Sequence, residues 1–166
     1  MVFKQSEHAT RLTMFLPDEE FKKIIQGSPL ISIDLLVRNE YNEYLLGKRL
    51  NEPAKNYWFV PGGRIQKNET ISQAIDRISV NELSIHLKLE QGRFHGVWQH
   101  FYHNNFFNDE FTTHYIVLAY IFNAERESIH PPQTQHQRFR WLRKEEILID
   151  STVHKYSASY FSDNDD

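Results

Sequence analysis

The sequence contains no cysteine, so disulfide bonds and metal sites built from thiolates are excluded. Glycine is scarce, with six residues, about half the number that average usage would give for this length. No apolar run approaches the roughly 18–20 residues of a membrane span, and the N-terminus lacks the apolar core of a signal peptide. The net charge of −3 argues against nucleic acid held by bulk charge, although a local basic pocket could still bind a phosphorylated small molecule. We therefore expect a cytoplasmic protein with no membrane or nucleic-acid partner.

What the sequence does contain is typical of one soluble globular domain. Of its 166 residues, 40% are hydrophobic and 25% are charged, and aromatic residues are abundant, with 12 Phe, 8 Tyr and 3 Trp. The polar, aperiodic segment 1–13 is expected to be a flexible extension, and the acidic residues 163–166 a frayed tail. The folded domain should therefore span residues 14–162.

Hydrophobic patterning predicts several strands with few helices between them, which favours a mixed α/β sandwich over a doubly wound sheet. Thr70 and Gln73 form a T-x-x-Q pattern, a capping box that places a helix start near Thr70. The pair Gly62-Gly63 is expected in a loop that ends the strand before it. The predicted strands are 30–37, 44–50, 57–60, 94–103, 111–122 and 139–142, and the predicted helices are 17–27, 70–84, 144–149 and 153–161.

The helix that follows Gly62-Gly63 has an unusual apolar stripe. Ile71, Ile75 and Ile78 fall on one face at helical spacing, and Glu82 continues the same line. A carboxylate that faces inward at a helix C-terminus is costly unless a cation lies beside it. The alternative is that Glu82 turns into water at the end of the helix, and the pattern alone leaves both open.

The glycine pair favours the first alternative. Glycine allows the backbone to approach a ligand closely and exposes its carbonyl groups. A backbone carbonyl and a carboxylate, completed by water and phosphate oxygens, suit Mg²⁺, which prefers oxygen ligands. The sequence therefore predicts a magnesium site between the Gly62-Gly63 loop and Glu82.

The same segment resembles the Nudix box, G-x5-E-x7-R-E-U-x-E-E-x-G-U, where U is a bulky aliphatic residue. The chain departs from the box at Ile78 and Asn81, where the family has glutamates, and at Ser84, where it has glycine. Nudix hydrolases usually use several of these acids to bind divalent metals and activate water, so the resemblance implies one metal ion and a general base from elsewhere. The matching positions are Gly63, Glu69, Arg77, Ser79 (weakly), Glu82 and Ile85.

Further strings along residues 14–161 are more specific. They are Met14-Phe15-Leu16, Leu46-Gly47-Lys48-Arg49, Tyr57 to Arg64, Gly96 to Tyr102, Phe111-Thr112-Thr113-His114-Tyr115 and Gln135-His136. In these strings the chain resembles the GDP-mannose mannosyl hydrolases, a divergent Nudix branch. The resemblance implies an α+β fold, a single-domain α/β/α sandwich with a mixed sheet, and a homodimer. It also implies Mg²⁺-dependent hydrolysis of GDP-mannose, and of GDP-glucose as a further substrate, by water attack at sugar C1 with inversion.

The resemblance also implies roles for particular residues. The metal ligands would be Gly62 through its carbonyl, Glu82 and Gln135, with Mg²⁺ as the metal and Mn²⁺ as a substitute. The general base would be His136, since histidine can accept a proton near neutral pH. The catalytic set is completed by two cations, Arg49 and Arg64, beside the pyrophosphate. The residues implied to bind substrate are Phe15, Leu16, Phe21, Asp34, Arg49, Arg64, Arg77, His100 and Tyr115.

Several alternatives stay open at this point. Arg77 could form an ion pair with Glu69, Phe21 could simply pack the first helix, and His114 could be a structural partner. For the whole protein, one alternative is a conventional Nudix pyrophosphatase that releases a nucleoside monophosphate and a sugar phosphate. Another is a non-catalytic nucleotide-sugar sensor. The missing acids at Ile78 and Asn81 argue against the first, and the retained Glu82, Arg64 and His136 argue against the second.

Overall fold

A seven-stranded mixed sheet forms the centre of the protein in a computed structural model that describes residues 16–132 and 138–162. Its main path runs β3-β2-β1-β6-β5, while β4 pairs with β1 and β7 pairs with β2. β1 and β6 are parallel along nine paired positions, and the other ladders between strands are antiparallel. The strands are β1 (Leu30–Arg38), β2 (Glu43–Lys48), β3 (Trp58–Phe59), β4 (Gly62–Arg64), β5 (Arg93–Tyr102), β6 (Thr113–Asn123) and β7 (Phe139–Arg143).

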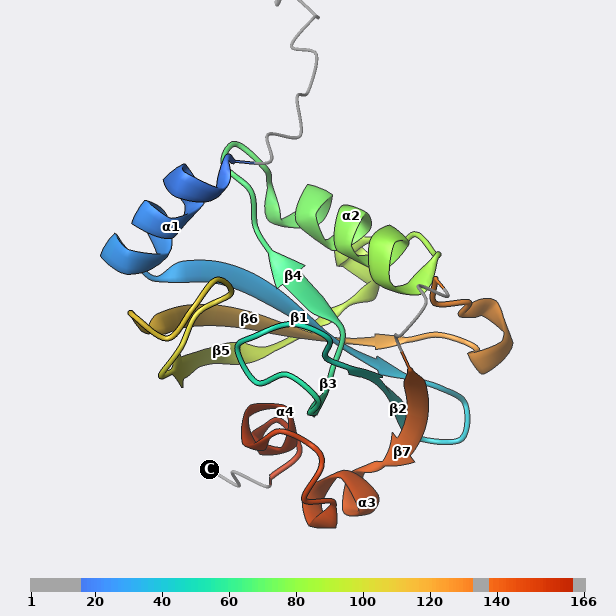
Figure 1. Ribbon diagram of the computed structural model, residues 1–166. Helices are drawn as coiled ribbons and strands as arrows, with labels where there is room; N and C mark the ends of the chain where they lie inside the picture. Colours follow the sequence, from blue (N-terminus) through green and yellow to red (C-terminus); the bar gives the residue numbers. More distant parts are fainter. Residues whose placement is uncertain (1–15, 133–137, 163–166) are drawn as a thin grey trace, which may run out of the picture.

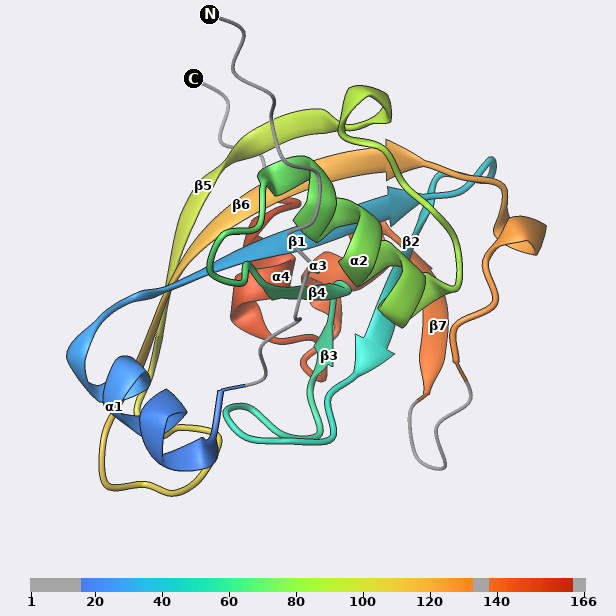
Figure 2. The ribbon, with the colours of Figure 1, turned by 90° about the horizontal axis from the view of Figure 1, so that it is seen from above.

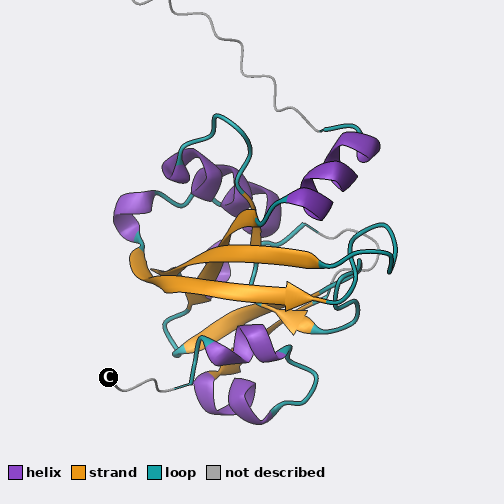
Figure 3. Cartoon of the chain, turned by 90° about the vertical axis from the view of Figure 1, so that its left-hand side faces the viewer, coloured by secondary structure: helices purple, strands orange, loops and turns teal. Residues whose placement is uncertain are grey.

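Helices cover both faces of this sheet (Figures 1 and 3). α2 (Ile71–Leu83) lies on one face, and the short helices α3 (Lys144–Ile149) and α4 (Lys155–Ser159) lie on the other. α1 (Asp18–Gly27) lies at one end, beside the loop between β5 and β6, as the view from above shows (Figure 2). Two 3₁₀ turns, Leu89–Gln91 and Arg126–Ser128, complete the chain. The predicted α/β/α sandwich with a mixed sheet is confirmed.

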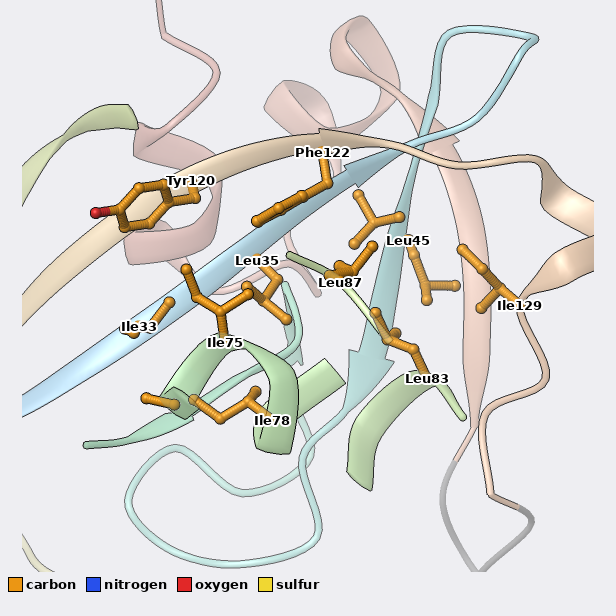
Figure 4. Packing of buried hydrophobic residues seen from close by; sticks show 12 residues of the cluster. Ile33, Leu35, Leu45, Ile75, Ile78, Leu83, Leu87, Tyr120, Phe122 and Ile129 are labelled. Atoms are coloured by element: carbon orange, nitrogen blue, oxygen red, sulfur yellow. The ribbon is translucent and has the colours of Figure 1, made fainter. Parts of the chain in front are cut away.

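The core between α2 and the sheet explains how the helix is anchored. Ile75 and Ile78 of α2 pack towards Ile33 and Leu35 of β1, in a buried cluster that also contains Leu83 (Figure 4). Burying an aliphatic side chain of this size contributes about 1.5–3 kcal/mol. A second cluster on the opposite face joins the sheet to α3 and α4; its members include Leu36, Leu46, Ile147, Val153, Tyr160 and Phe161.

The start of α2 follows the sequence signal, and the apolar stripe follows it only in part. The Thr70 side chain accepts from the Gln73 backbone N–H, and the Gln73 side chain accepts from the Thr70 N–H, so the predicted capping box is confirmed. Ile71, however, is 37% exposed, so the inward-facing stripe predicted for Ile71, Ile75 and Ile78 is wrong at its first member. It lies in the first turn, where the helix has not yet reached the sheet, and Ile75 and Ile78 make the contact.

The clearest error of the sequence prediction concerns the glycine pair. Gly62 and Gly63 do not form a loop; they belong to β4, where they pair with Asp34 and Ile33 of β1. A Cβ on Gly62 would collide with the Asp34 carboxylate and lie 2.7 Å from the Ile33 carbonyl oxygen. The absence of a side chain thus allows β4 to lie close against β1.

The remaining differences are boundary shifts. The third predicted strand shortens to Trp58–Phe59, the strand predicted over 111–122 begins at Thr113, and the last helix shortens to Lys155–Ser159. In the part of the chain that the structure describes, no helix is long and apolar enough to span a membrane. The N-terminal extension and the acidic tail lie outside the described residues, so the predicted domain limits stay predictions, as does the cytoplasmic location.

Candidate active site

A pocket of about 450 Å³ opens beside β4, a volume within the usual range for small-molecule sites. Its walls come from α1, β1, β4, the end of α2, β5, β6 and the loop after β2. Phe106, in the loop between β5 and β6, forms part of the rim and is more than half exposed. The pocket contains eight of the residues singled out from the sequence: Phe21, Asp34, Arg49, Gly62, Arg64, Glu82, His100 and Tyr115.

Other residues expected at the site are not placed there. Among the residues that the structure describes, Leu16 and Arg77 do not line the pocket. Phe15, Gln135 and His136 lie outside the described residues, so their expected roles as substrate contact, metal ligand and base stay predictions. His114 does not line the pocket either; its ring stacks on Phe101 with a centroid distance of 4.3 Å.

Asp34 is held in the pocket by a residue from the far end of the chain. Tyr160, which follows α4, donates its hydroxyl to Asp34 Oδ2 over 2.6 Å. The same hydroxyl lies 3.2 Å from His100 Nε2. A single buried tyrosine therefore connects a carboxylate of β1 with an imidazole of β5.

Burial shifts the pKa of both groups in this network. It raises the pKa of Asp34 to about 6, because desolvation outweighs the hydrogen bond from Tyr160 and the positive charge of Arg49. It lowers the pKa of His100 to about 4, with His154 and Arg49 acting in the same direction. At neutral pH, His100 is therefore a neutral imidazole with one ring proton.

Two guanidinium groups in the pocket lie on aromatic rings. Arg49 Cζ lies 4.8 Å from the centroid of the Phe59 ring, and Arg64 Cζ lies 4.0 Å from that of Phe21. The Phe59 ring is also stacked on His154, at a centroid distance of 4.6 Å with the rings 18° from parallel. Such contacts hold the flat face of a guanidinium and leave its edge N–H groups to bind an anion.

Arg77 is engaged elsewhere. Its Nε donates to Glu69 Oε1 at 2.7 Å, and one terminal nitrogen donates to Glu69 Oε2 at 2.9 Å and to the Arg64 carbonyl at 2.8 Å. The Glu69 side chain is only 5% exposed. The ion pair with Glu69, left open by the sequence, is therefore formed, and Arg77 ties α2 to the backbone of β4 beside the pocket.

The donors available to a metal ion are oxygens. Glu82 is half-buried and lines the pocket with Gly62 and Gly63. Ile78 stands where the Nudix box has a glutamate, and it is buried in the core with 2% exposure. Its side chain packs against Gly63, since a Cβ added to Gly63 would lie 3.1 Å from Ile78 Cγ1. Within residues 16–132 and 138–162, no cluster of three or more acidic or histidine side chains is placed to hold a metal. One carboxylate with backbone carbonyls still fits Mg²⁺, which commonly takes its other ligands from water and substrate phosphates.

Tyr102, which lines the pocket, and Tyr160 and His154, which contact lining residues from behind, were not predicted to take part. Tyr102 lies against Arg49, with Arg49 Cζ 5.8 Å from the ring centroid, and burial raises its pKa. Tyr102 was visible in the sequence only as part of an aromatic string. Tyr160 and His154 come from the C-terminal segment, whose pattern indicates a helix and contains no sign of contact with β1. Their roles depend on tertiary packing.

Comparisons with known proteins were made by family, by sequence and by structure. The NUDIX domain model matches residues 29–161. The low-salt glycan biosynthesis protein Agl8 of Haloferax volcanii is 35% identical over 136 residues, which are 82% of this chain and 85% of that protein. The MutT protein of Methanosarcina mazei Go1 is similar in structure, with a TM-score of 0.64 and 21% identity over 81% of this chain and 92% of that one. The MutT NUDIX hydrolase of Burkholderia pseudomallei has the same TM-score at 18% identity, over 81% and 96%.

Proposed function

This chain belongs to the Nudix family of hydrolases, and on that basis we propose that it hydrolyses GDP-mannose to GDP and free mannose. The observation that carries the proposal is the mixture of groups in one pocket. Asp34 and His100 suit the hydroxyl groups of a sugar, and Arg49 and Arg64 suit a diphosphate. GDP-glucose, which offers the same kinds of group, is a further substrate under this proposal.

The bond that breaks is the one between sugar C1 and the diphosphate oxygen. Water attacks C1 from the opposite face, its oxygen becomes the C1 hydroxyl with inversion, and the electron pair of the broken bond leaves with GDP. The leaving diphosphate is already stable as an anion, so it needs neutralisation more than a proton. Arg49 and Arg64, fixed on Phe59 and Phe21, supply positive charge there without having to reorganise during the reaction.

We assign the metal to the oxygen donors beside β4. Glu82 and the Gly62 carbonyl would hold Mg²⁺, or Mn²⁺ as a substitute, together with Gln135. When bound, the ion would add positive charge next to the leaving diphosphate. The general base in this proposal is His136, and inverting hydrolysis of a sugar needs such a base on the face opposite the leaving group.

The two alternatives make different demands on the pocket. A conventional Nudix pyrophosphatase draws on several box acids, but here one of those positions, Ile78, is buried in the core and Asn81 is exposed and uncharged. A sensor needs recognition only and no base. The name of the Haloferax relative associates that protein with glycan biosynthesis, and a nucleotide-sugar substrate for this chain is consistent with that context.

A homodimer is part of the proposal. Ile31, Val97 and Phe101, from β1 and β5, are each more than half exposed. They belong to the face of the sheet that α2 covers, because Ile31 shares a face of β1 with Ile33, which packs with α2, and Val97 is in register with Ile33 across β6. A second copy could cover them. Sedimentation equilibrium of the protein and of Val97→Asp should then give a dimer and a monomer, and a monomeric wild type would contradict this part.

Product analysis tests the reaction itself. The protein is incubated with GDP-mannose and Mg²⁺, and the products are separated by ion-exchange chromatography. GDP and neutral mannose are expected, and a chelator such as EDTA should stop their release. GMP and mannose 1-phosphate would indicate the pyrophosphatase instead, while binding of GDP-mannose without any product would indicate a sensor.

A further inference from the structure

Tyr160 has a position that the reaction itself does not explain. It is 3% exposed and packs in the core cluster beneath the sheet, in a T-shaped contact with Trp98 at a centroid distance of 4.9 Å. Only its hydroxyl reaches the polar groups, at 2.6 Å from Asp34 Oδ2 and 3.2 Å from His100 Nε2. A buried phenol with one polar partner on β1 and another on β5, the strands on either side of β6, can fix the orientation of both.

The protons of this network can be counted. A tyrosine hydroxyl has one proton to donate, and the short distance to Asp34 is typical of an O–H···O⁻ hydrogen bond. The same oxygen can then only accept from His100, so the single proton of the neutral imidazole must lie on Nε2. His100 Nδ1 is consequently an acceptor, and Asp34 Oδ1 is the carboxylate oxygen that Tyr160 does not bind.

We propose that Tyr160 is a positioning residue that fixes the Asp34 carboxylate and the Nε2–H tautomer of His100, and thereby prepares the sugar-binding part of the pocket. The inference rests on the proposed function for the identity of the sugar. Two acceptors in this arrangement select hydroxyl donors and repel phosphate oxygens. Tyr160 therefore discriminates between the two parts of a nucleotide sugar without touching either.

The tautomer can be measured without any substrate. In ¹⁵N-labelled protein, long-range ¹H–¹⁵N correlations of the histidine rings distinguish Nε2–H from Nδ1–H. We expect Nε2–H for His100 in the wild type, and a loss of that preference in Tyr160→Phe, which keeps the ring and removes the hydroxyl. A wild-type His100 with its proton on Nδ1 would overturn the proposal.

Kinetics supply the second measurement, with Tyr156→Phe as the matched control. Tyr156 lies in α4, four positions before Tyr160, and its hydroxyl bonds only to the backbone of Phe101, at 2.8 and 2.7 Å. In Tyr160→Phe we expect kcat/KM for GDP-mannose to fall about 10- to 100-fold, the usual effect of removing a hydrogen bond to a charged group. Inhibition by GDP, which lacks the mannose, should change by less than about twofold, and Tyr156→Phe should keep kcat/KM within a similar range.

The outcomes separate this inference from the proposed function. Equal values of kcat/KM in Tyr160→Phe and Tyr156→Phe would overturn the role of Tyr160 while leaving the hydrolase intact. A loss of GDP affinity as large as the loss of kcat/KM would also overturn it, because the effect would then not be specific to the mannose part of the substrate. A wild type that releases no GDP and mannose contradicts the proposed function, and the His100 tautomer still decides the role of Tyr160.

Discussion

The Tyr160 hydroxyl lies 2.6 Å from the Asp34 carboxylate, although 126 positions separate the two residues in the chain. The contact joins the C-terminal segment to β1, in the centre of the sheet. Asp34 is also the residue that a side chain at Gly62 would strike. The position of Asp34 in the pocket is therefore limited on two sides, by the Tyr160 hydroxyl that binds it and by Gly62 of β4 that lies against it.

The first prediction concerns that glycine. Gly62→Ala would place a methyl group against the Asp34 carboxylate and the Ile33 carbonyl, so β4 would have to move away from β1. We expect the free energy of unfolding to fall by about 1–3 kcal/mol, as for other overpacked sites, as measured by urea denaturation.

Gly27→Ala is the control for this change. Nothing lies within 4 Å of the added methyl group, and the residue ends helix α1. Its stability should be unchanged or higher by up to about 1 kcal/mol. Equal stability of the two variants would show that close approach of β4 to β1 does not depend on Gly62.

The second prediction tests why the Nudix box is reduced. Ile78→Glu restores the box acid but buries a carboxylate beside Ile75 and Leu83 in the core. We expect a loss of at least about 3 kcal/mol of stability, because an unpaired buried charge is costly. Asn81→Glu restores the other acid at an exposed position and should change stability by no more than about 0.5 kcal/mol.

Both variants are measured by urea denaturation with and without Mg²⁺. A stable Ile78→Glu protein that binds additional metal would contradict the account, since it would mean that the core tolerates the ordinary Nudix arrangement.

The third prediction is a pH dependence of stability. Burial lowers the pKa of both His100 and His154 to about 4, below the ordinary value of 6.5. As the pH falls from 6.5 to 4, these two histidines therefore become protonated in the unfolded chain before they do in the folded chain. The free energy of unfolding decreases as a result. Asp34, whose raised pKa is about 6, acts in the opposite direction over part of this range.

His154→Asn isolates one of these groups. Asparagine can keep the cap that His154 Nδ1 provides to the Tyr156 N–H at the start of α4. The slope of the unfolding free energy against pH measures the number of protons taken up on unfolding. Between pH 6.5 and 4, this number should decrease by up to about one in the variant. If urea unfolding gives the same slope for both proteins, His154 does not contribute in the way described.

The fourth prediction concerns the proposed base. His136→Gln should lower kcat by about 10²- to 10⁴-fold, the usual contribution of a general base, with little change in the affinity for GDP. Steady-state kinetics and GDP inhibition measure the two effects separately. A nearly normal kcat would remove His136 from this role and favour Asp34, a pocket carboxylate whose pKa of about 6 suits proton transfer.

Local signals predicted much of the fold. The Thr70–Gln73 capping box marked the start of α2, and the apolar runs marked most strands to within a few residues. β4 was missed because three residues with two glycines carry no strand pattern, and their pairing with β1 depends on close approach of the two backbones.

The site was predictable to a smaller degree. The family resemblance implied site roles for Asp34, Arg49 and Arg64, and the helix pattern beside the glycine pair pointed to Glu82; all four line one pocket. Tyr160 was not predictable, because nothing in a short C-terminal helix indicates that the side chain just after it meets a carboxylate of β1.

The central claim is that water attacks carbon and not phosphorus, and the fate of the water oxygen tests it most directly. GDP-mannose is hydrolysed with Mg²⁺ in ¹⁸O-labelled water, and the products are analysed by mass spectrometry. We expect label in free mannose, in the C1 hydroxyl, and none in GDP. Label in a phosphate-containing product, together with the appearance of GMP, would contradict it.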